Sequence, residues 1–213
     1  MPTDGRLDAL IFDAGGVFVP HDNEFLFARL ASRCAVPDAA ERLRAVHDRD
    51  PRIGTGEMTI EDVHQRLTDQ LGYDAGWDDF LEDWSCHLQV DWRMLDLMTA
   101  LAAENRVLVF SNTNARHWAR VEAMTGGALD RFELYLSHEI GAVKPELEAF
   151  ALVAGRAGVE PGRCLFIDDM AQNVEAARRA GFQAEQFTGQ RALETLLETR
   201  GVRWARQTQE TMT

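Results

Sequence analysis

Short apolar segments recur along the chain, and each is followed by a stretch whose apolar residues have helical spacing. These segments cover residues 7–13, 106–112, 131–137, 163–169 and 183–187. Those at 7–13, 106–112 and 163–169 contain nearly continuous apolar runs without polar alternation, which is typical of strands buried on both faces. Because helical stretches alternate with them, the pattern predicts an α/β fold with a doubly wound parallel sheet.

A long insertion separates the first predicted strand from the second. More than ninety residues lie between them, which is too many for one crossover helix and indicates a segment with its own structure. Apolar residues at three- and four-residue spacings predict helices at 23–36, 38–50, 59–72 and 77–89. The sequence therefore predicts a small all-helical domain over residues 18–92, inserted into a core domain made of residues 1–17 and 93–213.

Local signals support the third helix of the insertion. Thr59 can cap its start, with acidic residues in the first turn, and Gly72 can end it. Further along, an aromatic-rich stripe comprises Trp77, Trp84 and Trp92 with Phe80, Leu81 and Leu88. Such a stripe is consistent with a packed helix face, with a subunit contact or with the wall of a substrate cavity. The sequence leaves a monomer and a homodimer equally open.

Composition narrows the class of protein. The 213 residues are 46% hydrophobic and carry a formal charge of −13, so binding to nucleic-acid phosphates is disfavoured. An anionic small molecule remains a possible ligand if a metal ion or a lysine screens its charge. The chain shows neither a signal peptide nor an apolar run long enough for a membrane, which predicts a cytoplasmic protein with no membrane contact. The three widely spaced cysteines, Cys34, Cys86 and Cys164, are interpreted as core residues.

Polar residues follow several of the predicted strands. Asp13 ends "LIFD" and is followed by Ala14, Gly15 and Gly16, while Ser111 and Asn112 end "VLVFSN". Taken singly, these residues also suit a turn and a helix cap. In a parallel sheet, however, the carboxyl ends of the strands converge on the crevice where ligands bind.

Two further polar groups lie downstream. Lys144 lies in "GAVKPE", where a loop lysine is ordinarily solvated, and Asp168 and Asp169 follow the apolar run "LFI". Adjacent carboxylates raise the pKa of one another, and a cation offsets that cost. The paired acids therefore predict a metal site.

In order and spacing, these motifs resemble the haloacid dehalogenase superfamily of hydrolases. Asp13, Ser111, Lys144 and Asp168 are separated by gaps of 98, 33 and 24 residues, and the helical insertion resembles the small cap domain of that superfamily. The resemblance covers nearly the whole chain. It implies a Rossmann-like core with an inserted helical cap.

The resemblance also implies a role for each motif. Asp13 is expected to be the nucleophile that forms an aspartyl-phosphate, and Lys144 is expected to offset its charge against the phosphate. Ser111 and Asn112 are expected to bind phosphate oxygens. Gly16, next to Gly15, is expected to allow backbone N–H groups to approach the same anion.

The implied cofactor is Mg²⁺. The resemblance places it between Asp13, the backbone carbonyl of Gly15 and Asp169, with Asp168 as a second or more distant ligand. Asn173 is expected to orient a water molecule on the metal. Phosphoryl transfer needs such a cation because nucleophile and substrate are both anionic.

The sequence departs from the superfamily at Gly15. Most of its phosphatases carry a second aspartate there, which protonates the leaving group and later deprotonates water, a contribution typically worth about 10²–10⁴-fold. Some sugar-phosphate phosphatases that the chain resembles also carry glycine. Water, the substrate, or a side chain such as His21 or Asp22 would then take this role, although both residues also suit the entry to the first helix of the insertion.

The leading hypothesis is a Mg²⁺-dependent phosphomonoesterase that acts on a small phosphorylated metabolite, with sugar phosphates as one candidate class. One alternative is a 2-haloacid dehalogenase, which would use the same aspartate without a metal, but the adjacent Asp168 and Asp169 weigh against it. A second alternative is a weakly active protein that binds a phosphorylated ligand or a protein partner. Gly15 is the feature that favours this last hypothesis.

Overall fold

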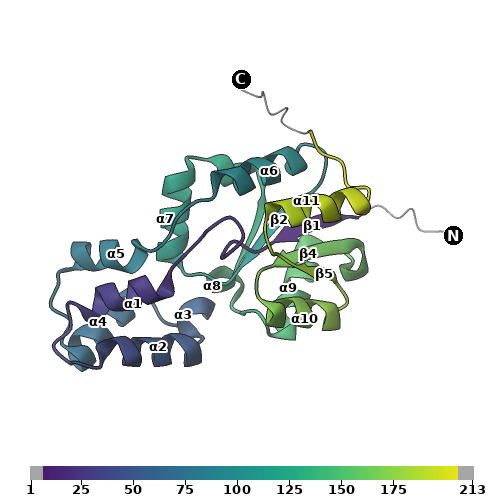
Figure 1. Cartoon of the computed structure of the whole chain (residues 1–213). Coiled ribbons are helices and arrows are strands. Elements are labelled where there is room, and N and C mark those ends of the chain that lie inside the picture. The colour runs from purple at the N-terminus through teal and green to yellow at the C-terminus, as the bar shows by residue number, and fades with distance from the viewer. Residues whose placement is uncertain (1–6, 206–213) are drawn as a thin grey trace, which may run out of the picture.

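The computed structural model describes residues 7–205, so the ends of the predicted core domain, 1–6 and 206–213, lie outside the described residues. Its centre is a five-stranded parallel sheet in the order β3-β2-β1-β4-β5 (Figure 1). The strands are β1 (Ala9–Phe12), β2 (Val107–Ser111), β3 (Glu133–Leu136), β4 (Cys164–Asp168) and β5 (Gln183–Gln186). Each predicted segment contains one of them, and the predicted doubly wound parallel sheet is confirmed.

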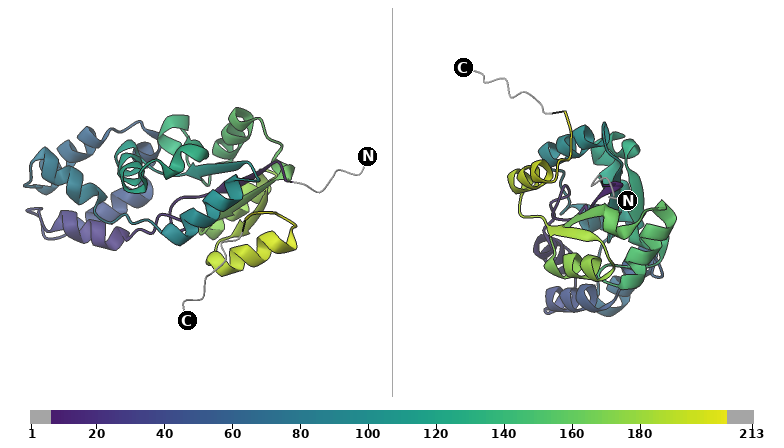
Figure 2. Two further views of the ribbon diagram at one scale, coloured as in Figure 1. Left: turned by 90° about the horizontal axis from the view of Figure 1, so that it is seen from above. Right: turned by 90° about the vertical axis from the view of Figure 1, so that its right-hand side faces the viewer.

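Helices cover both faces of the sheet (Figures 1 and 2). The bounds in this part of the chain are α6 (Trp92–Ala102), α7 (Ala115–Thr125), η1 (Ala128–Arg131), α8 (Ser137–Ile140), α9 (Leu147–Ala157), η2 (Pro161–Arg163), α10 (Ala171–Arg179) and α11 (Gln190–Thr199). Leu10 and Phe12 belong to the cluster with α6, α7 and α11, whereas Ala9 and Ile11 belong to the cluster with α9 and α10. Because both faces are buried, β1 has no polar position, which explains its continuous apolar sequence.

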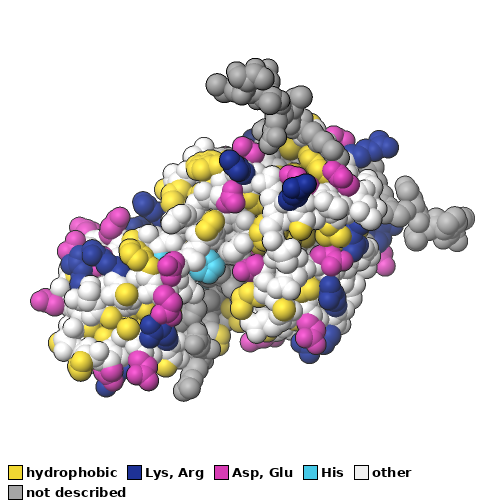
Figure 3. All heavy atoms as spheres, viewed as in Figure 1, with side chains coloured by type: hydrophobic (Ala, Val, Ile, Leu, Met, Phe, Trp, Pro, Cys, Tyr) yellow, Lys and Arg dark blue, Asp and Glu magenta, His cyan; other side chains and the backbone are white. Residues whose placement is uncertain are grey.

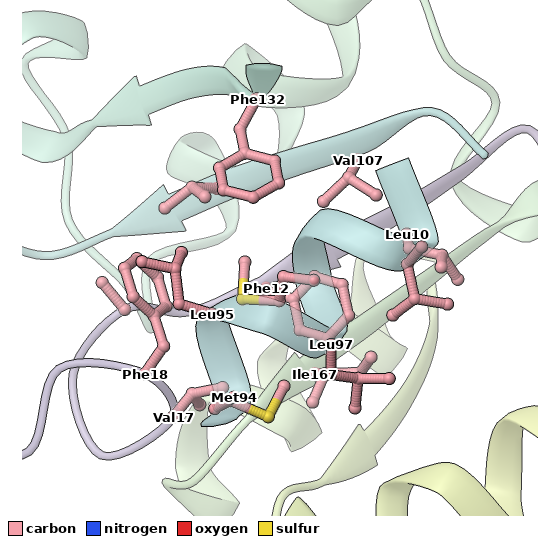
Figure 4. Packing of buried hydrophobic residues seen from close by; sticks show 14 of the residues in the cluster. Leu10, Phe12, Val17, Phe18, Met94, Leu95, Leu97, Val107, Phe132 and Ile167 are labelled. Atoms are coloured by element: carbon pink, nitrogen blue, oxygen red, sulfur yellow. The ribbon is translucent and has the colours of Figure 1, made fainter. Parts of the chain in front are cut away.

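The residues after β1 join the first of these clusters. Val17 and Phe18 are buried and pack with Met94 and Leu95 of α6 (Figure 4). The segment that follows Asp13 is therefore held against the core by apolar contacts before it enters the insertion.

The insertion contains only helices among its regular elements: α1 (Asn23–Ala31), α2 (Ala39–Arg49), α3 (Arg52–Thr55), α4 (Ile60–Leu71) and α5 (Trp77–Ser85). Their apolar faces form a cluster of their own, separate from those of the sheet. The predicted cap of α4 is confirmed, since Thr59 and Asp62 form a reciprocal capping box and Gly72 ends the helix at φ 64°. The short α3 was not predicted. The division into domains at 17/18 and 92/93 stays a prediction.

Two connecting segments join the insertion to the core, and they lie side by side. The backbone N–H of Gln89 donates to the carbonyl of Pro20 (2.9 Å), and that of Asp91 donates to Phe18 (2.9 Å). His21 and Leu88 form an antiparallel bridge between the same segments. This pairing fixes the position of His21 relative to the end of β1.

The aromatic stripe is divided between interior and surface. Phe80 and Trp84 are buried, with ring centroids 5.8 Å apart, whereas Trp77 and Trp92 are 37% and 52% exposed. Trp84 also stacks on His117 of α7 with centroids 5.3 Å apart, so it links the insertion to the core. Packing accounts for the buried part of the stripe.

The three cysteines are all free thiols. Cys164 is fully buried, as predicted, whereas Cys34 and Cys86 are only partly buried. Over residues 7–205, every helix is too short or too polar to cross a bilayer.

Candidate active site

The carboxyl ends of the three central strands bring the predicted residues together. β1 lies between β2 and β4 in the sheet, with Phe12 paired with Val109 on one side and Ile167 on the other. Asp13 follows β1 directly and its N–H donates to the carbonyl of Ile167 (2.8 Å). Asp168 is the last residue of β4, so both carboxylates project from the same edge of the sheet.

Lys144 lies between these two carboxylates. Its Nζ is 2.9 Å from Oδ1 of Asp13 and 2.7 Å from Oδ2 of Asp168, and the side chain is 1% exposed. The rings of Phe110 and Phe166 lie 5.2 and 5.4 Å from the ammonium nitrogen. Burial by itself lowers the pKa of Lys144, but the two carboxylates outweigh it and raise that pKa. Lys144 therefore stays a cation.

The sequence contains a second indication that this residue is unusual, independent of the spacing of the motifs. Lys144 is the chain's single lysine, whereas the other basic residues among the 22 are arginines. Arginine occupies the exposed basic positions, while the compact ammonium group occupies the buried one between two carboxylates. A count of lysines would have marked this position as exceptional.

Asp168 has its hydrogen-bonding capacity taken up by the protein. Its Oδ1 accepts from the backbone N–H of Met170 (2.8 Å), both of its oxygens are 3.0 Å from Nδ2 of Asn173, and Oδ2 also accepts from Lys144. It is fully buried. These contacts suit a residue that holds Lys144 and Asn173 in place.

Asp169 turns its side chain the other way, toward the loop after β1. Its Oδ2 lies close to Gly16, whose missing side chain leaves room for the carboxylate. Its backbone carbonyl accepts from Nε2 of Gln186 (2.8 Å), which anchors the peptide. Asp169 is only partly buried, so its carboxylate is the one of the adjacent pair that a solvent-borne ligand can reach.

Three carboxylates form a compact cluster. One oxygen from each of Asp13, Asp168 and Asp169 lies within 4.8 Å of the others. Burial, and then the charge of Asp168, raise the pKa of Asp13 to about 6 against the lowering effect of Lys144. Burial and Asp168 also raise the pKa of Asp169. One lysine thus leaves the cluster short of positive charge.

The residues present fit a hard divalent cation. Carboxylate oxygens are the ligands that Mg²⁺ prefers. The raised pKa values of Asp13 and Asp169 mean that a nearby positive charge would stabilise their ionised forms. Oδ1 of Asn173 is buried and accepts no hydrogen bond from the described residues, as expected for an atom that serves a metal-bound water. The arrangement therefore fits a cation at Asp13 and Asp169.

Gly16 has two physical reasons to be glycine. Its φ is +65°, in the left-handed region, and a Cβ there would lie 2.1 Å from Oδ2 of Asp169. No such contact is possible without movement of the carboxylate. Gly16 is thus required for the position of Asp169, whereas its backbone N–H, which was predicted to face the anion, donates to the carbonyl of Val19 (3.2 Å).

We expect Gly16→Ala to weaken Mg²⁺ binding by at least about tenfold, because the displaced Asp169 carboxylate no longer lies beside Asp13. Gly158→Ala is the matched control, since Gly158 has nearly the same φ of +63° and nothing within 4 Å of its Cβ position. Calorimetric titration with Mg²⁺ measures both variants. Equal affinities in the two would show that Asp169 is not a ligand.

The segment after β2 differs in part from the prediction. Asn112 was predicted to bind phosphate, but its amide bonds the backbone of Lys144, with Nδ2 donating to the carbonyl (2.8 Å) and Oδ1 accepting from the N–H (2.9 Å). Ser111 is buried at the end of β2. The structure thus gives Asn112 a positioning contact, and the roles of both residues in substrate binding stay predictions.

Neighbouring residues that the sequence reasoning missed complete this region. Asn114, rather than Ser111 or Asn112, caps α7, since its Oδ1 accepts from the N–H of His117 (3.0 Å). The N–H of Thr113 donates to Oγ of Ser137 (2.9 Å), which in turn donates to the carbonyl of Thr113 (3.0 Å). The run of polar residues at 111–114 indicated a helix cap, but the sequence alone did not show which of them provides it.

A profile of haloacid dehalogenase-like hydrolases matches residues 7–181 of this chain. The chain belongs to the haloacid dehalogenase-like hydrolase family. Its sequence is 27% identical over 186 residues to D-ribitol-5-phosphate phosphatase of Bacteroides thetaiotaomicron. The aligned residues cover 83% of this chain and 90% of that protein. The predicted family is thereby confirmed, and the chain is a hydrolase of that family.

Solved structures of the family show the same fold. The HAD family enzyme bt-2542 of Bacteroides thetaiotaomicron matches with a TM-score of 0.80 at 25% identity, over 90% of this chain and 98% of that one. A second structure of that enzyme, in complex with magnesium and inorganic phosphate, matches with a TM-score of 0.77 at 25% identity, over 86% and 96%. L-2-haloacid dehalogenase of Xanthobacter autotrophicus shares the fold with a TM-score of 0.57 at 21% identity, over 91% and 83%.

Proposed function

We propose that this hydrolase is a Mg²⁺-dependent phosphomonoesterase of small phosphorylated metabolites, with sugar and polyol phosphates as the substrate class. The observation that carries the proposal is the cluster of Asp13, Asp168 and Asp169 around a single lysine. Without a metal ion, one lysine leaves such a site short of positive charge. The similarity to D-ribitol-5-phosphate phosphatase supports the choice of substrate class.

In this proposal Asp13 is the nucleophile. Its Oδ1 is held by the N–H of Ala14 (2.7 Å) and by Lys144, which leaves Oδ2 as the oxygen with room to attack phosphorus. The attack forms an aspartyl-phosphate and releases the alcohol, and water then hydrolyses the intermediate. Lys144 offsets the negative charge of Asp13 as the phosphate approaches.

Mg²⁺, when bound, would neutralise the phosphate oxygens and the attacking carboxylate together. Asp13, Asp169 and the carbonyl of Gly15 are the proposed ligands. Asp168 keeps Lys144 and Asn173 oriented and is proposed not to bind the metal directly. Ser111 is proposed to bind a phosphate oxygen, whereas the N–H of Gly16 donates to the carbonyl of Val19 (3.2 Å).

A panel of phosphomonoesters assayed with Mg²⁺ and with EDTA tests the proposal. We expect turnover of polyol and sugar phosphates, D-ribitol 5-phosphate among them, with Mg²⁺ and none with EDTA. A 2-haloacid serves as the comparison substrate, because a dehalogenase of this fold would release halide in EDTA. Halide release without phosphate release, or tight phosphoester binding without turnover, would contradict the proposal.

A further inference from the structure

Gly15 faces the imidazole of His21. A Cβ at position 15 would lie 3.2 Å from Cε1 and 3.6 Å from Nδ1 of His21, and 4.0 Å from Oδ2 of Asp13. Gly15 is not among the residues with positive φ, so its backbone conformation does not require glycine. The ring therefore occupies the space into which a longer side chain at position 15 would extend.

The backbone fixes this imidazole in place. The antiparallel bridge to Leu88 positions the His21 backbone, and the ring lies edge-on to His87 with centroids 6.5 Å apart. Nδ1 lies 3.3 Å from the carbonyl oxygen of Val19, which can only accept, so the hydrogen on Nδ1 is donated there. Nε2 is then the ring nitrogen that is available to a ligand.

The ring borders the acidic cluster and remains open to solvent. The ring and Oδ2 of Asp13 both lie within 4.0 Å of the Cβ position of residue 15, and His21 is an exposed residue. Figure 3 shows histidine side-chain atoms exposed on the face where the insertion adjoins the core. A phosphoester bound at Oδ2 of Asp13 would therefore lie beside an exposed imidazole.

We propose that His21 contacts the leaving-group oxygen of the substrate and donates a proton to it, a role that rests on the proposed function. As Oδ2 of Asp13 bonds to phosphorus, the ester P–O bond breaks with its electron pair on the leaving oxygen. That oxygen takes the proton that the imidazolium form of His21 carries on Nε2, which leaves a neutral ring protonated on Nδ1, and departs as the alcohol. In the second step water attacks phosphorus, its proton goes to Nε2, and the bond to Asp13 breaks to release phosphate.

The test compares leaving groups. Protonation matters for a poor leaving group such as an alkoxide and little for p-nitrophenolate. We therefore expect His21→Gln to lower kcat/KM for D-ribitol 5-phosphate and glycerol 3-phosphate by about 10²–10³-fold, and for p-nitrophenyl phosphate by less than about tenfold. His64→Gln is the control, because His64 bonds the carbonyl of Ala75 within the insertion and lies against Phe80.

Equal losses on both substrate types, or no loss, would overturn this role while the wild type still hydrolyses phosphoesters. Absence of turnover by the wild type would instead remove the proposed function itself.

A double variant gives a second test. Gly15→Asp alone brings its carboxylate into the His21 ring, whereas Gly15→Asp with His21→Ala should hydrolyse alkyl phosphates at least tenfold faster than His21→Ala. A double variant no faster than His21→Ala would contradict the proposal.

Discussion

Asp13→Asn is expected to reduce Mg²⁺-dependent hydrolysis of phosphomonoesters by on the order of 10⁴-fold or more, because an amide oxygen cannot replace the nucleophilic carboxylate. Steady-state phosphate release measures the effect. The fold should be intact, because the amide fits the same space and Lys144 keeps its bond to Asp168. A variant that retains turnover within tenfold of the wild type would exclude Asp13 as the nucleophile.

The same substitution has a second effect, on pH dependence. Burial raises the pKa of Asp13 to about 6, above its ordinary value near 3.8, so its contribution to stability is present below pH 4 and is lost as the pH rises through 6. In EDTA, Asp13→Asn should therefore be as stable as the wild type or more stable at pH 7.5. The advantage should shrink at pH 4.5. Urea unfolding at the two pH values measures the difference.

Lys144→Met is expected to cost about 3–5 kcal/mol of unfolding free energy, because it leaves Asp13 and Asp168 buried without their shared cation. It should also lower kcat/KM by at least about 10²–10³-fold, since nothing then offsets the charge of the nucleophile. The pKa of Asp13 should rise further, so the stability loss should be larger at pH 7.5 than at pH 5. Urea unfolding in EDTA and phosphate-release assays with Mg²⁺ measure these effects.

The control for Lys144→Met is Arg44→Met. Arg44 pairs with Glu24 at the surface of the insertion, where both side chains are exposed and solvent screens their charges, so its loss should change the unfolding free energy little. If the two variants lost equal stability, the ion pairs at Lys144 would be no more important than a surface pair. The contacts of Lys144 with Asp13 and Asp168 would then not stabilise the site as proposed.

The sheet and the ends of its strands were predictable because their signals are local. Apolar runs such as that before Asp13 give the strands, and a polar residue directly after a run lies at the edge of a parallel sheet. The pairing of Asp168 and Asp169 indicated a cation from their adjacency alone. Their separate orientations, one toward Lys144 and one toward Gly16, could not be inferred from adjacency.

Contacts between distant segments account for what the sequence did not predict. The amide of Asn112 bonds the backbone of Lys144 across 32 positions, and only the fold brings the two together. The place of His21 beside Gly15 depends on the pairing of residues 18–22 with residues 86–91. The sequence could suggest His21 as a proton donor, but it could not place the ring.

The central claim is that Asp13 and Asp169 share one divalent cation at the carboxyl edge of the sheet. Anomalous diffraction from crystals soaked in Mn²⁺, a hard cation that takes the same oxygen ligands as Mg²⁺, tests it most directly. The account predicts one strong peak within coordination distance of both carboxylates. A peak bound by only one of them, or no peak at this edge in crystals that hold Mn²⁺ elsewhere, would contradict it.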